Sequence, residues 1–217
     1  MSRKRVAVLI SGRGSNMAAL IEAAKDTTYP AEIALVLSNR ADAGGLLVAR
    51  AAGISTEVVE HTEFGKDRAA FERALQATLD KYRIEIICLA GFMRLLTADF
   101  VGRWQGRILN IHPALLPDFK GLDTHRRAIE ARAKRHGATV HFVVPEMDSG
   151  PIIAQGVVNV RPDDSEEALA ARVLKVEHQI YPLALKLVAE DRIRIENGHC
   201  LIDGVPVPAT SSLVPSA

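Results

Sequence analysis

The sequence of 217 residues has only two cysteines, Cys88 and Cys200, which lie far apart. Two distant cysteines supply neither a disulfide framework nor the paired spacing of a zinc site, and this favours a reducing compartment. Long hydrophobic runs are also missing. The apolar segment after the basic residues 3–5 is short and leads straight into a glycine-rich loop, unlike a signal peptide or a membrane span. We therefore expect a cytoplasmic protein with no membrane partner.

An excess of charge of one sign is missing as well. The chain carries 27 Lys and Arg against 26 Asp and Glu, for a net charge of +1, and the charges are interspersed. No basic stripe marks a nucleic-acid partner. The seven histidines include no His-x-x-x-His spacing, so we expect no metal. The length suits one large domain, which we place at 1–204, followed by a tail at 205–217 rich in Pro, Ser and Thr that we expect to be mobile.

Apolar or β-branched runs alternate with helical patterns along the first half of the chain, which is typical of a parallel sheet wound with helices. The patterns predict strands at 6–10, 32–38, 56–60, 84–90 and 107–111, and helices at 16–25, 44–52, 66–82 and 97–103. Beyond 112 they predict a loop to 121, a helix at 124–134, an antiparallel strand pair at 139–144 and 152–160, and a helix at 165–190 kinked by Pro182. We therefore predict an α/β fold: a single three-layer domain with a Rossmann-like, mostly parallel sheet and an antiparallel C-terminal part.

Two polar side chains interrupt the apolar strand expected before Pro113. Because side chains on a strand alternate faces, Asn110 and His112 point the same way. Pro113 cannot continue the ladder, so the pair lies at the carboxyl end of the strand, where α/β sheets bind ligands. A buried Asn and His held by neighbouring backbone is the alternative. The pairing and its position favour an active site.

The glycine-rich segment 11–16, Ser-Gly-Arg-Gly-Ser-Asn, follows the first strand and opens a helix. Free backbone amides and the helix dipole favour an anion at such a place, and glycines let the backbone approach it. A dinucleotide fingerprint is absent, because Met17 stands where its third glycine would be. The alternative is an ordinary turn with Ser15 or Asn16 as the helix N-cap.

Five segments together resemble the folate-dependent formyltransferase superfamily, in particular its branch in purine synthesis. They are the segment 11–16, Leu89-Ala90-Gly91-Phe92-Met93-Arg94, Asn110-x-His112-Pro113-x-Leu115-Leu116-Pro117, the run 141–151 and Glu177-His178-x-x-Tyr181-Pro182. They span nearly the whole chain in the family's order. The resemblance implies the formyltransferase fold and transfer of the formyl group of 10-formyltetrahydrofolate to the amine of 5'-phosphoribosylglycinamide. It implies these small molecules as partners, no metal, and a monomer or homodimer.

By the same resemblance Asn110, His112 and Asp148 are the catalytic residues. Local sequence alone would make Asp148 a cap of the turn at 146–151. An amine that attacks a formyl group must lose a proton, while the carbonyl oxygen becomes negative. We expect His112, held as a cation by Asp148, and Asn110 to donate hydrogen bonds to that oxygen. Asp148 would carry the amine proton, directly or through water, towards the departing folate nitrogen.

The remaining site residues follow from the resemblance too. Those expected to bind the phosphorylated substrate are Gly14, Ser15, Asn16 and Glu177. Those expected to bind the folate are Arg68, Met93, Arg94, Leu95, Leu96, Asn110 and Val144. Arg68 could equally be a solvated helix residue, Glu177 a surface residue, and His141 a structural one.

Two positions depart from the family, which often has Asn at Arg13 and His at Asp123, so the response of the 113–122 loop to pH is open. A formyltetrahydrofolate deformylase, which uses the same trio with water as acceptor, is the alternative function. It usually has an N-terminal regulatory domain, and a methionyl-tRNA formyltransferase has a basic C-terminal one; neither is visible here. A non-catalytic folate- or phosphate-binding protein is a further alternative.

Overall fold

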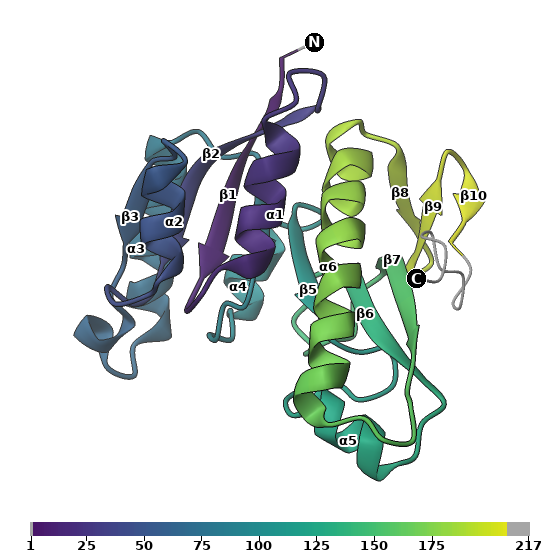
Figure 1. The fold of residues 1–217 in the computed structure, drawn as a ribbon. Coiled ribbons are helices and arrows are strands. Elements are labelled where there is room, and N and C mark those ends of the chain that lie inside the picture. Colours follow the sequence, from purple (N-terminus) through teal and green to yellow (C-terminus); the bar gives the residue numbers. More distant parts are fainter. Residues whose placement is uncertain (1, 208–217) are drawn as a thin grey trace. The chain divides into compact units, whose positions relative to one another are not determined.

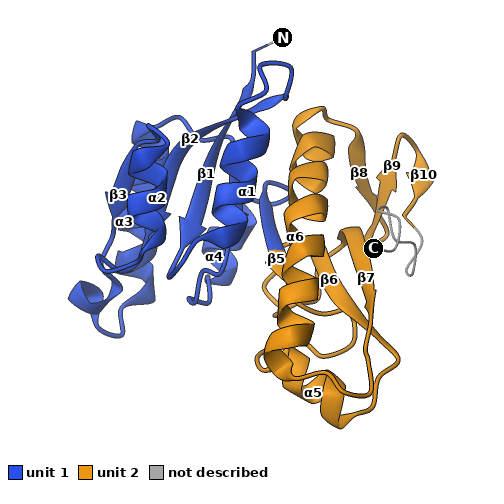
Figure 2. Ribbon diagram, in the orientation of Figure 1, with its two compact units in different colours: residues 1–110 blue, residues 111–217 orange. Residues whose placement is uncertain are grey.

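The computed structural model describes residues 2–207 and divides into two compact units, unit 1 ending at Asn110 and unit 2 beginning at Ile111 (Figure 2). The hydrogen-bonded strand order is β3-β2-β1-β4-β5-β6-β7, and β5 (Ile108–His112) carries residues of both units. A separate sheet has the order β10-β9-β8. The α/β fold expected from the sequence, with a mostly parallel sheet and an antiparallel C-terminal part, is confirmed.

Unit 1 is a parallel sheet wound with helices. Its strands, with β5, are β1 (Lys4–Ile10), β2 (Ala31–Ser38), β3 (Thr56–Val58) and β4 (Ile86–Leu89). Its helices are α1 (Ser15–Ala24), α2 (Gly45–Ala51), the short 3-10 helix η1 (His61–Phe64), α3 (Arg68–Lys81) and α4 (Ala98–Arg103). Each pair of neighbouring strands from β3 to β5 is parallel. The central strand β1 is fully buried from Val6 to Ile10, as a strand covered on both faces must be.

The strand order places a switch point between β1 and β4. The chain first moves outward through β2 to β3 and then returns to β4 on the other side of β1. Because parallel crossovers are right-handed, α1 and α2 cover one face of the sheet, and α3 and α4 cover the other (Figure 1). Ligands of such sheets bind beyond the carboxyl ends of the strands at the switch point. In unit 1 the segments at that place are 11–14 and 91–97.

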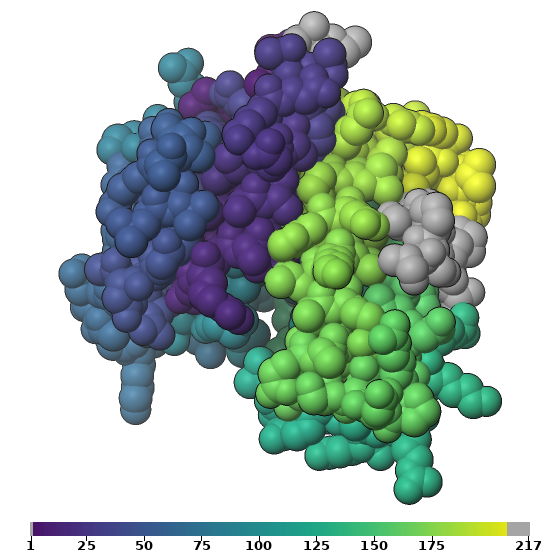
Figure 3. All heavy atoms as spheres, viewed as in Figure 1, coloured from purple at the N-terminus to yellow at the C-terminus, as the bar shows by residue number. Residues whose placement is uncertain are grey.

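Unit 2 is built on an antiparallel strand pair and one long helix. Its elements are α5 (Thr124–Glu130), β6 (Arg135–Phe142), β7 (Ile152–Asn159), α6 (Glu166–Ala189), β8 (Ile193–Glu196), β9 (His199–Ile202) and β10 (Val205–Pro206). β6 and β7 are antiparallel, as expected, and α6 packs on both. The outer side of α6, yellow-green in Figure 3, lies at the surface. A Cβ added at Gly156 of β7 would lie only 1.9 Å from a methyl carbon of Val176, so glycine allows this close packing.

Several boundaries differ from the sequence-based expectations for local reasons. The third helix of unit 1 begins at Arg68 rather than at 66, because the Asp67 carboxylate accepts a hydrogen bond from the Ala70 amide at 2.8 Å and caps the helix. α5 ends at Glu130 and not at 134, since the chain turns into the left-handed region at Arg132, with φ of 50°. The strand predicted from 139 consequently begins at Arg135.

The small sheet of β8, β9 and β10 was missed. Asn197 and Gly198 link β8 to β9 with φ of 51° and 78°, and an Asn-Gly pair between alternating residues is a strong hairpin signal. β10 pairs with β9 within the segment predicted as a tail from residue 205. The rest of that segment, 208–217, lies outside the described residues, so its mobility stays a prediction.

Candidate active site

His112 and Asp148 come together in unit 2 although they are distant in the sequence. The Nδ1 atom of His112 lies 3.5 Å from an Asp148 carboxylate oxygen, and the two side chains are only 6% and 10% exposed. His112 is the last residue of β5, and Asp148 belongs to the turn that joins β6 to β7. The strand pair thus brings a carboxylate to the carboxyl end of β5. A buried pair of this kind is where proton transfer chemistry is expected.

Local backbone geometry fixes the orientation of Asp148. The residue lies in the left-handed region, with φ of 49°, which Asp tolerates better than most residues. Its Oδ2 atom also accepts a hydrogen bond from the Gly121 amide at 2.9 Å. Beside it, the Lys120 ammonium donates to the Ser149 hydroxyl at 2.7 Å. Hydrogen bonds of Asp148 and Ser149 therefore connect this turn to the 113–122 loop.

The second nitrogen of the His112 ring also faces an oxygen. Nε2 lies 3.0 Å from the Phe119 carbonyl, which can only accept a hydrogen bond. Nδ1 faces the Asp148 carboxylate, another acceptor. Both ring nitrogens of His112 therefore face groups that can only accept hydrogen bonds. The Phe119 contact was not expected, and no local signal in the sequence marks it.

His141 approaches Asp148 from β6. Its Nε2 atom lies 3.8 Å from the Asp148 carboxylate, and its Nδ1 atom donates to the Phe142 carbonyl at 2.9 Å. Burial lowers the pKa of His141. The hydrogen bond to the Phe142 carbonyl and the charge of Asp148 raise the pKa by a smaller amount, so the net shift is downward. The ring is therefore neutral near pH 7. Of the two histidines beside Asp148, His112 lies nearer, at 3.5 Å against 3.8 Å.

The 113–122 loop is held by buried polar side chains of the strand pair. The Thr139 hydroxyl donates to the Ala114 carbonyl at 2.7 Å and accepts from the Leu116 amide at 3.1 Å. The Gln155 side chain donates to the Leu116 carbonyl at 2.9 Å. At the far end, Asp123 is the left-handed N-cap of α5 and pairs with Arg126 at 2.6 Å. These contacts place the loop that carries Phe119 beside His112.

Asn110 lies on β5 two residues before His112, so the two side chains share a face of the strand, as predicted. Asn110 is half-buried, whereas His112 is 5% exposed. It is the last residue of unit 1, next to the boundary within β5. The strand alone therefore places the side chains of Asn110 and His112 next to each other on one face.

The glycine-rich segment of unit 1 forms a tight turn into α1. Gly14 is the N-cap, with φ of 74°, so the alternative in which Ser15 or Asn16 caps the helix is wrong. A Cβ at Gly14 would lie 3.1 Å from the Gly45 Cα atom, and a Cβ at Gly45 would lie 3.1 Å from the Gly12 carbonyl oxygen. Two glycines therefore pack the turn against the start of α2. Gly45 was not among the predicted site residues, but its packing supports this turn.

The turn that begins α1 suits an anion. The N-terminus of an α-helix directs backbone amides towards a ligand, and the helix dipole adds a positive potential there. Ser15 is exposed and Asn16 half-buried, and the neighbouring Arg13 side chain is exposed. The segment thus offers backbone donors and one cation to a phosphate group.

The segment after β4 exposes apolar side chains at the switch point. Met93 is 65% exposed and Leu95 59%, while Arg94 and Leu96 are half-buried. Exposed methionine and leucine side chains offer the apolar surface that suits a flat heteroaromatic ring. Arg68, also in unit 1, is the exposed first residue of α3.

Two further predicted site residues lie in unit 2. Val144 is half-buried in the segment that follows β6. Glu177 is 7% exposed on α6, so the alternative in which it is a surface residue is wrong.

Within residues 2–207 no group of three or more His, Cys, Asp and Glu side chains is arranged to hold a metal ion. In the same part of the chain, no helix combines the length and apolar character that crossing a bilayer requires.

The fold and this site define a class of α/β enzymes that transfer one-carbon groups, and comparison with known proteins identifies the family. Residues 4–185 match the formyl transferase family. Phosphoribosylglycinamide formyltransferase of Escherichia coli K12 is 44% identical over 94% of this chain and 95% of its own length. The trifunctional purine biosynthetic protein adenosine-3 of Homo sapiens is 46% identical over 90% of this chain, which spans only 19% of that longer protein.

A solved structure agrees with the sequence comparison. Phosphoribosylglycinamide formyltransferase of Coxiella burnetii, in complex with CHES, has a TM-score of 0.91 and 43% identity. The match covers 97% of this chain and 99% of that chain. The chain therefore belongs to the formyl transferase family, and the resemblance found in the sequence is confirmed.

Proposed function

We propose that the protein transfers the formyl group of 10-formyltetrahydrofolate to the amine of 5'-phosphoribosylglycinamide, a step of purine synthesis. The observation that carries the proposal is the buried pair of His112 and Asp148 on the strand that also bears Asn110. The names and the extent of similarity of the Escherichia coli and Coxiella burnetii relatives support the choice of substrates.

In this proposal unit 1 supplies much of the binding. The amides and side chains of Gly14, Ser15 and Asn16 hold the phosphate of the glycinamide. Met93, Arg94, Leu95 and Leu96 border the folate ring, with Asn110 and Val144 as further contacts, and Arg68 meets a carboxylate of the folate tail. Glu177, buried on α6, accepts hydrogen bonds from ribose hydroxyls.

The chemistry falls to Asn110, His112 and Asp148. The substrate amine attacks the formyl carbon, and the formyl oxygen gains negative charge. His112 donates to this oxygen from Nε2, and Asn110 donates from its amide. In this structure Nε2 faces the Phe119 carbonyl, so the formyl oxygen takes the place of that carbonyl.

Asp148 serves both as the partner of His112 and as the proton carrier. Its charge stabilises the imidazolium across 3.5 Å. It accepts the proton that the attacking amine loses, directly or through water, and passes it to the departing folate nitrogen. The carbon–nitrogen bond to the folate then breaks, leaving tetrahydrofolate and the formylated glycinamide. No step requires a metal.

The test is to follow the release of tetrahydrofolate from 10-formyltetrahydrofolate with and without phosphoribosylglycinamide. We expect release only when the glycinamide is present. Release without it would make the protein a deformylase, and no release in either case would favour a binding protein. Asp148→Asn is the control for contaminating activity, because it removes a proposed proton carrier and should abolish most of the signal.

We further propose a cytoplasmic location and small-molecule partners, with neither nucleic acid nor membrane among them. The near-neutral charge and the interspersed acidic and basic residues support this. The monomer or homodimer expected from the sequence stays a prediction, which light scattering of the purified protein would test.

A further inference from the structure

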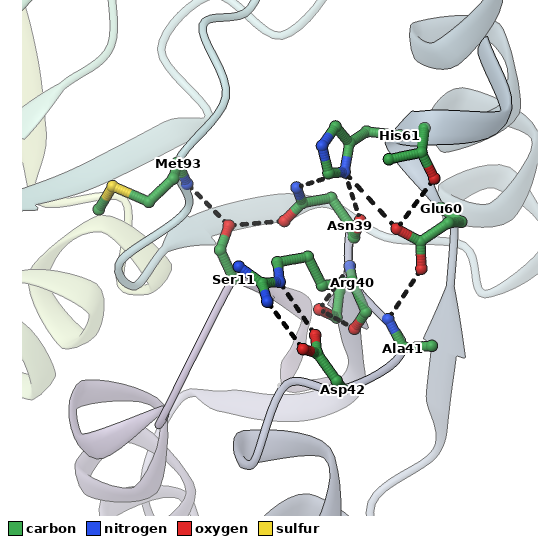
Figure 4. Close-up of polar contacts among 10 residues, drawn as sticks. Ser11, Asn39, Arg40, Ala41, Asp42, Glu60, His61 and Met93 are labelled. Carbon is green, nitrogen blue, oxygen red and sulfur yellow. Dashed lines mark hydrogen bonds and ion pairs between the residues drawn. The ribbon is translucent and has the colours of Figure 1, made fainter. Parts of the chain in front are cut away.

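The Ser11 side chain links the segments that follow β2 and β4 of unit 1, at the switch point (Figure 4). Its hydroxyl oxygen accepts a hydrogen bond from the Met93 amide at 2.8 Å, and the hydroxyl donates to the Asn39 side-chain oxygen at 2.5 Å. The Ser11 amide also donates to the Gly91 carbonyl at 3.2 Å. Ser11 and Asn39 are 9% and 2% exposed, so water competes little for these bonds. A single serine thus fixes the start of the segment 91–97.

Asn39 is itself held in place, so it can orient the serine hydroxyl. Nδ1 of His61 lies 2.8 Å from the Asn39 carbonyl oxygen, which also accepts from the His61 amide at 3.3 Å. A carboxylate oxygen of Glu60 lies 3.7 Å from the same Nδ1 atom. The nitrogen of the Asn39 side-chain amide also lies 3.2 Å from this Nδ1 atom, so His61 contacts both the backbone and the side chain of Asn39. The chain of contacts therefore runs from η1 through Asn39 and Ser11 to the Met93 amide.

The other end of the segment is fixed by a buried carboxylate. Glu72 of α3 is 6% exposed, and its two oxygens accept hydrogen bonds from the Thr97 amide at 2.6 Å and from the Thr97 hydroxyl at 2.5 Å. Between these anchors Met93 and Leu95 remain exposed. An exposed apolar segment with both ends held by buried side chains is preorganised, which reduces the entropy cost of binding.

We propose that Ser11 and Glu72 are positioning residues that hold the segment 91–97 in the conformation that binds the folate ring. This inference rests on the proposed function, because that function assigns the folate to Met93, Arg94, Leu95 and Leu96. Neither side chain needs to touch the folate. Ser11 acts through the Met93 amide, and Glu72 acts through Thr97.

The test is calorimetric titration of 10-formyltetrahydrofolate, and separately of phosphoribosylglycinamide, into wild type and Ser11→Ala. We expect the folate Kd of Ser11→Ala to rise about tenfold, since a buried amide and a buried amide oxygen each lose a partner. The glycinamide Kd should change less than about twofold. Ser38→Ala is the matched control. Ser38 is also buried at the carboxyl end of its strand, but its hydroxyl donates to the Arg40 carbonyl and not to the segment 91–97.

A second comparison covers the case in which Ser11→Ala does not fold. Glu72→Gln keeps an oxygen for the Thr97 amide and an amide for the Thr97 hydroxyl, whereas Glu72→Ala keeps neither. We expect the folate Kd to rise in Glu72→Ala and to stay near wild type in Glu72→Gln. Ser11→Thr, which retains the hydroxyl, should likewise recover tight binding.

Equal folate affinity in Ser11→Ala and Ser38→Ala would overturn the positioning role. An equal loss of affinity for both substrates would overturn it too, because that is the result of general disorder. Binding is measured here without turnover, so the two proposals can fail separately. A wild-type protein that binds folate but transfers nothing to the glycinamide contradicts only the proposed function, and one that binds no folate contradicts both.

Discussion

Unit 1 and unit 2 present different kinds of groups at their proposed sites. In unit 1 the glycine-rich turn at 12–14 offers backbone amides, and the segment 91–97 offers exposed apolar side chains. In unit 2 the site consists of buried ionisable side chains, chiefly His112 and Asp148. Six of the seven histidines belong to unit 2, with only His61 in unit 1. In the proposed function, unit 1 therefore supplies most of the binding groups, whereas proton transfer falls to unit 2.

The two kinds of site carry different energetic costs. A glycine turn costs backbone entropy but needs no burial of charge. A buried carboxylate is costly unless it is paired, and Asp148 lies 3.5 Å from the His112 ring and accepts a hydrogen bond from the Gly121 amide. Substitutions should therefore separate turnover in unit 2 from affinity in unit 1.

The largest effect is expected at Asp148. Replacing it with Asn keeps the shape of the side chain but removes the proton acceptor and the partner of His112. Turnover should fall by on the order of 10²–10⁴, while the Kd of each substrate changes much less. Steady-state kinetics combined with calorimetry separates the two. The matched control is Glu146→Gln in the same turn, where the side chain is exposed. Equal kinetics in the two variants would mean that Asp148 has no role in the chemistry.

A smaller effect, on affinity, is expected in the glycine turn. Ala at Gly14 would be strained at φ of 74° and would press on Gly45 and Met17. We expect the KM for phosphoribosylglycinamide to rise about tenfold or more, with the KM for the folate within about twofold. Gly12→Ala is the matched control, because an added Cβ there meets nothing within 4 Å. A KM for the glycinamide that is unchanged in Gly14→Ala would argue against a phosphate site at this turn.

The smallest expected effect is on the stability of the fold at acid pH, and it concerns His136 of unit 2. Burial, together with the nearby His125 ring and His112, lowers the pKa of His136 to about 4. In the unfolded chain the pKa is about 6.5, so between these values the unfolded state binds more protons and stability falls as the pH falls. His136→Gln should therefore lose less stability than wild type on acidification.

Urea unfolding at pH 8 and pH 5 measures this difference. The loss of unfolding free energy between the two should be about 1–2 kcal/mol smaller in His136→Gln than in wild type. It should not vanish, because burial also lowers the pKa values of His125, His141 and His178. His199→Gln, at an exposed histidine of the same unit, should match wild type. A pH dependence that is identical in His136→Gln and wild type would show that this ring does not titrate as its burial implies.

The fold could be predicted from the sequence wherever burial is periodic or continuous. The apolar strands around Val6 and Cys88, and the alternation of strands and helices, gave the parallel sheet of unit 1. The ends of elements were less predictable, because a side-chain cap such as Asp67 or a left-handed residue such as Arg132 decides them. The hairpin at Asn197 and Gly198 is absent from the predicted elements, although its turn residues are a strong hairpin signal.

The site could be predicted only in part, because contacts between distant residues carry no local signal. Strand alternation alone places Asn110 and His112 on one face. Asp148 entered through the family resemblance, since its separation from His112 in the sequence says nothing about distance in space. Phe119 acts through its backbone carbonyl, Gly45 through its lack of a side chain, and Ser11 through a hydroxyl that binds distant groups. The sequence pattern reveals none of these contacts.

The central claim is formyl transfer between the two substrates, and the most direct measurement follows the formyl group itself. The protein is given 10-formyltetrahydrofolate with an isotopically labelled formyl group together with phosphoribosylglycinamide, and the products are analysed by mass spectrometry. We predict that the label appears in formylated glycinamide in amounts equal to the tetrahydrofolate released. Label recovered as free formate, with the glycinamide unchanged, would contradict the account.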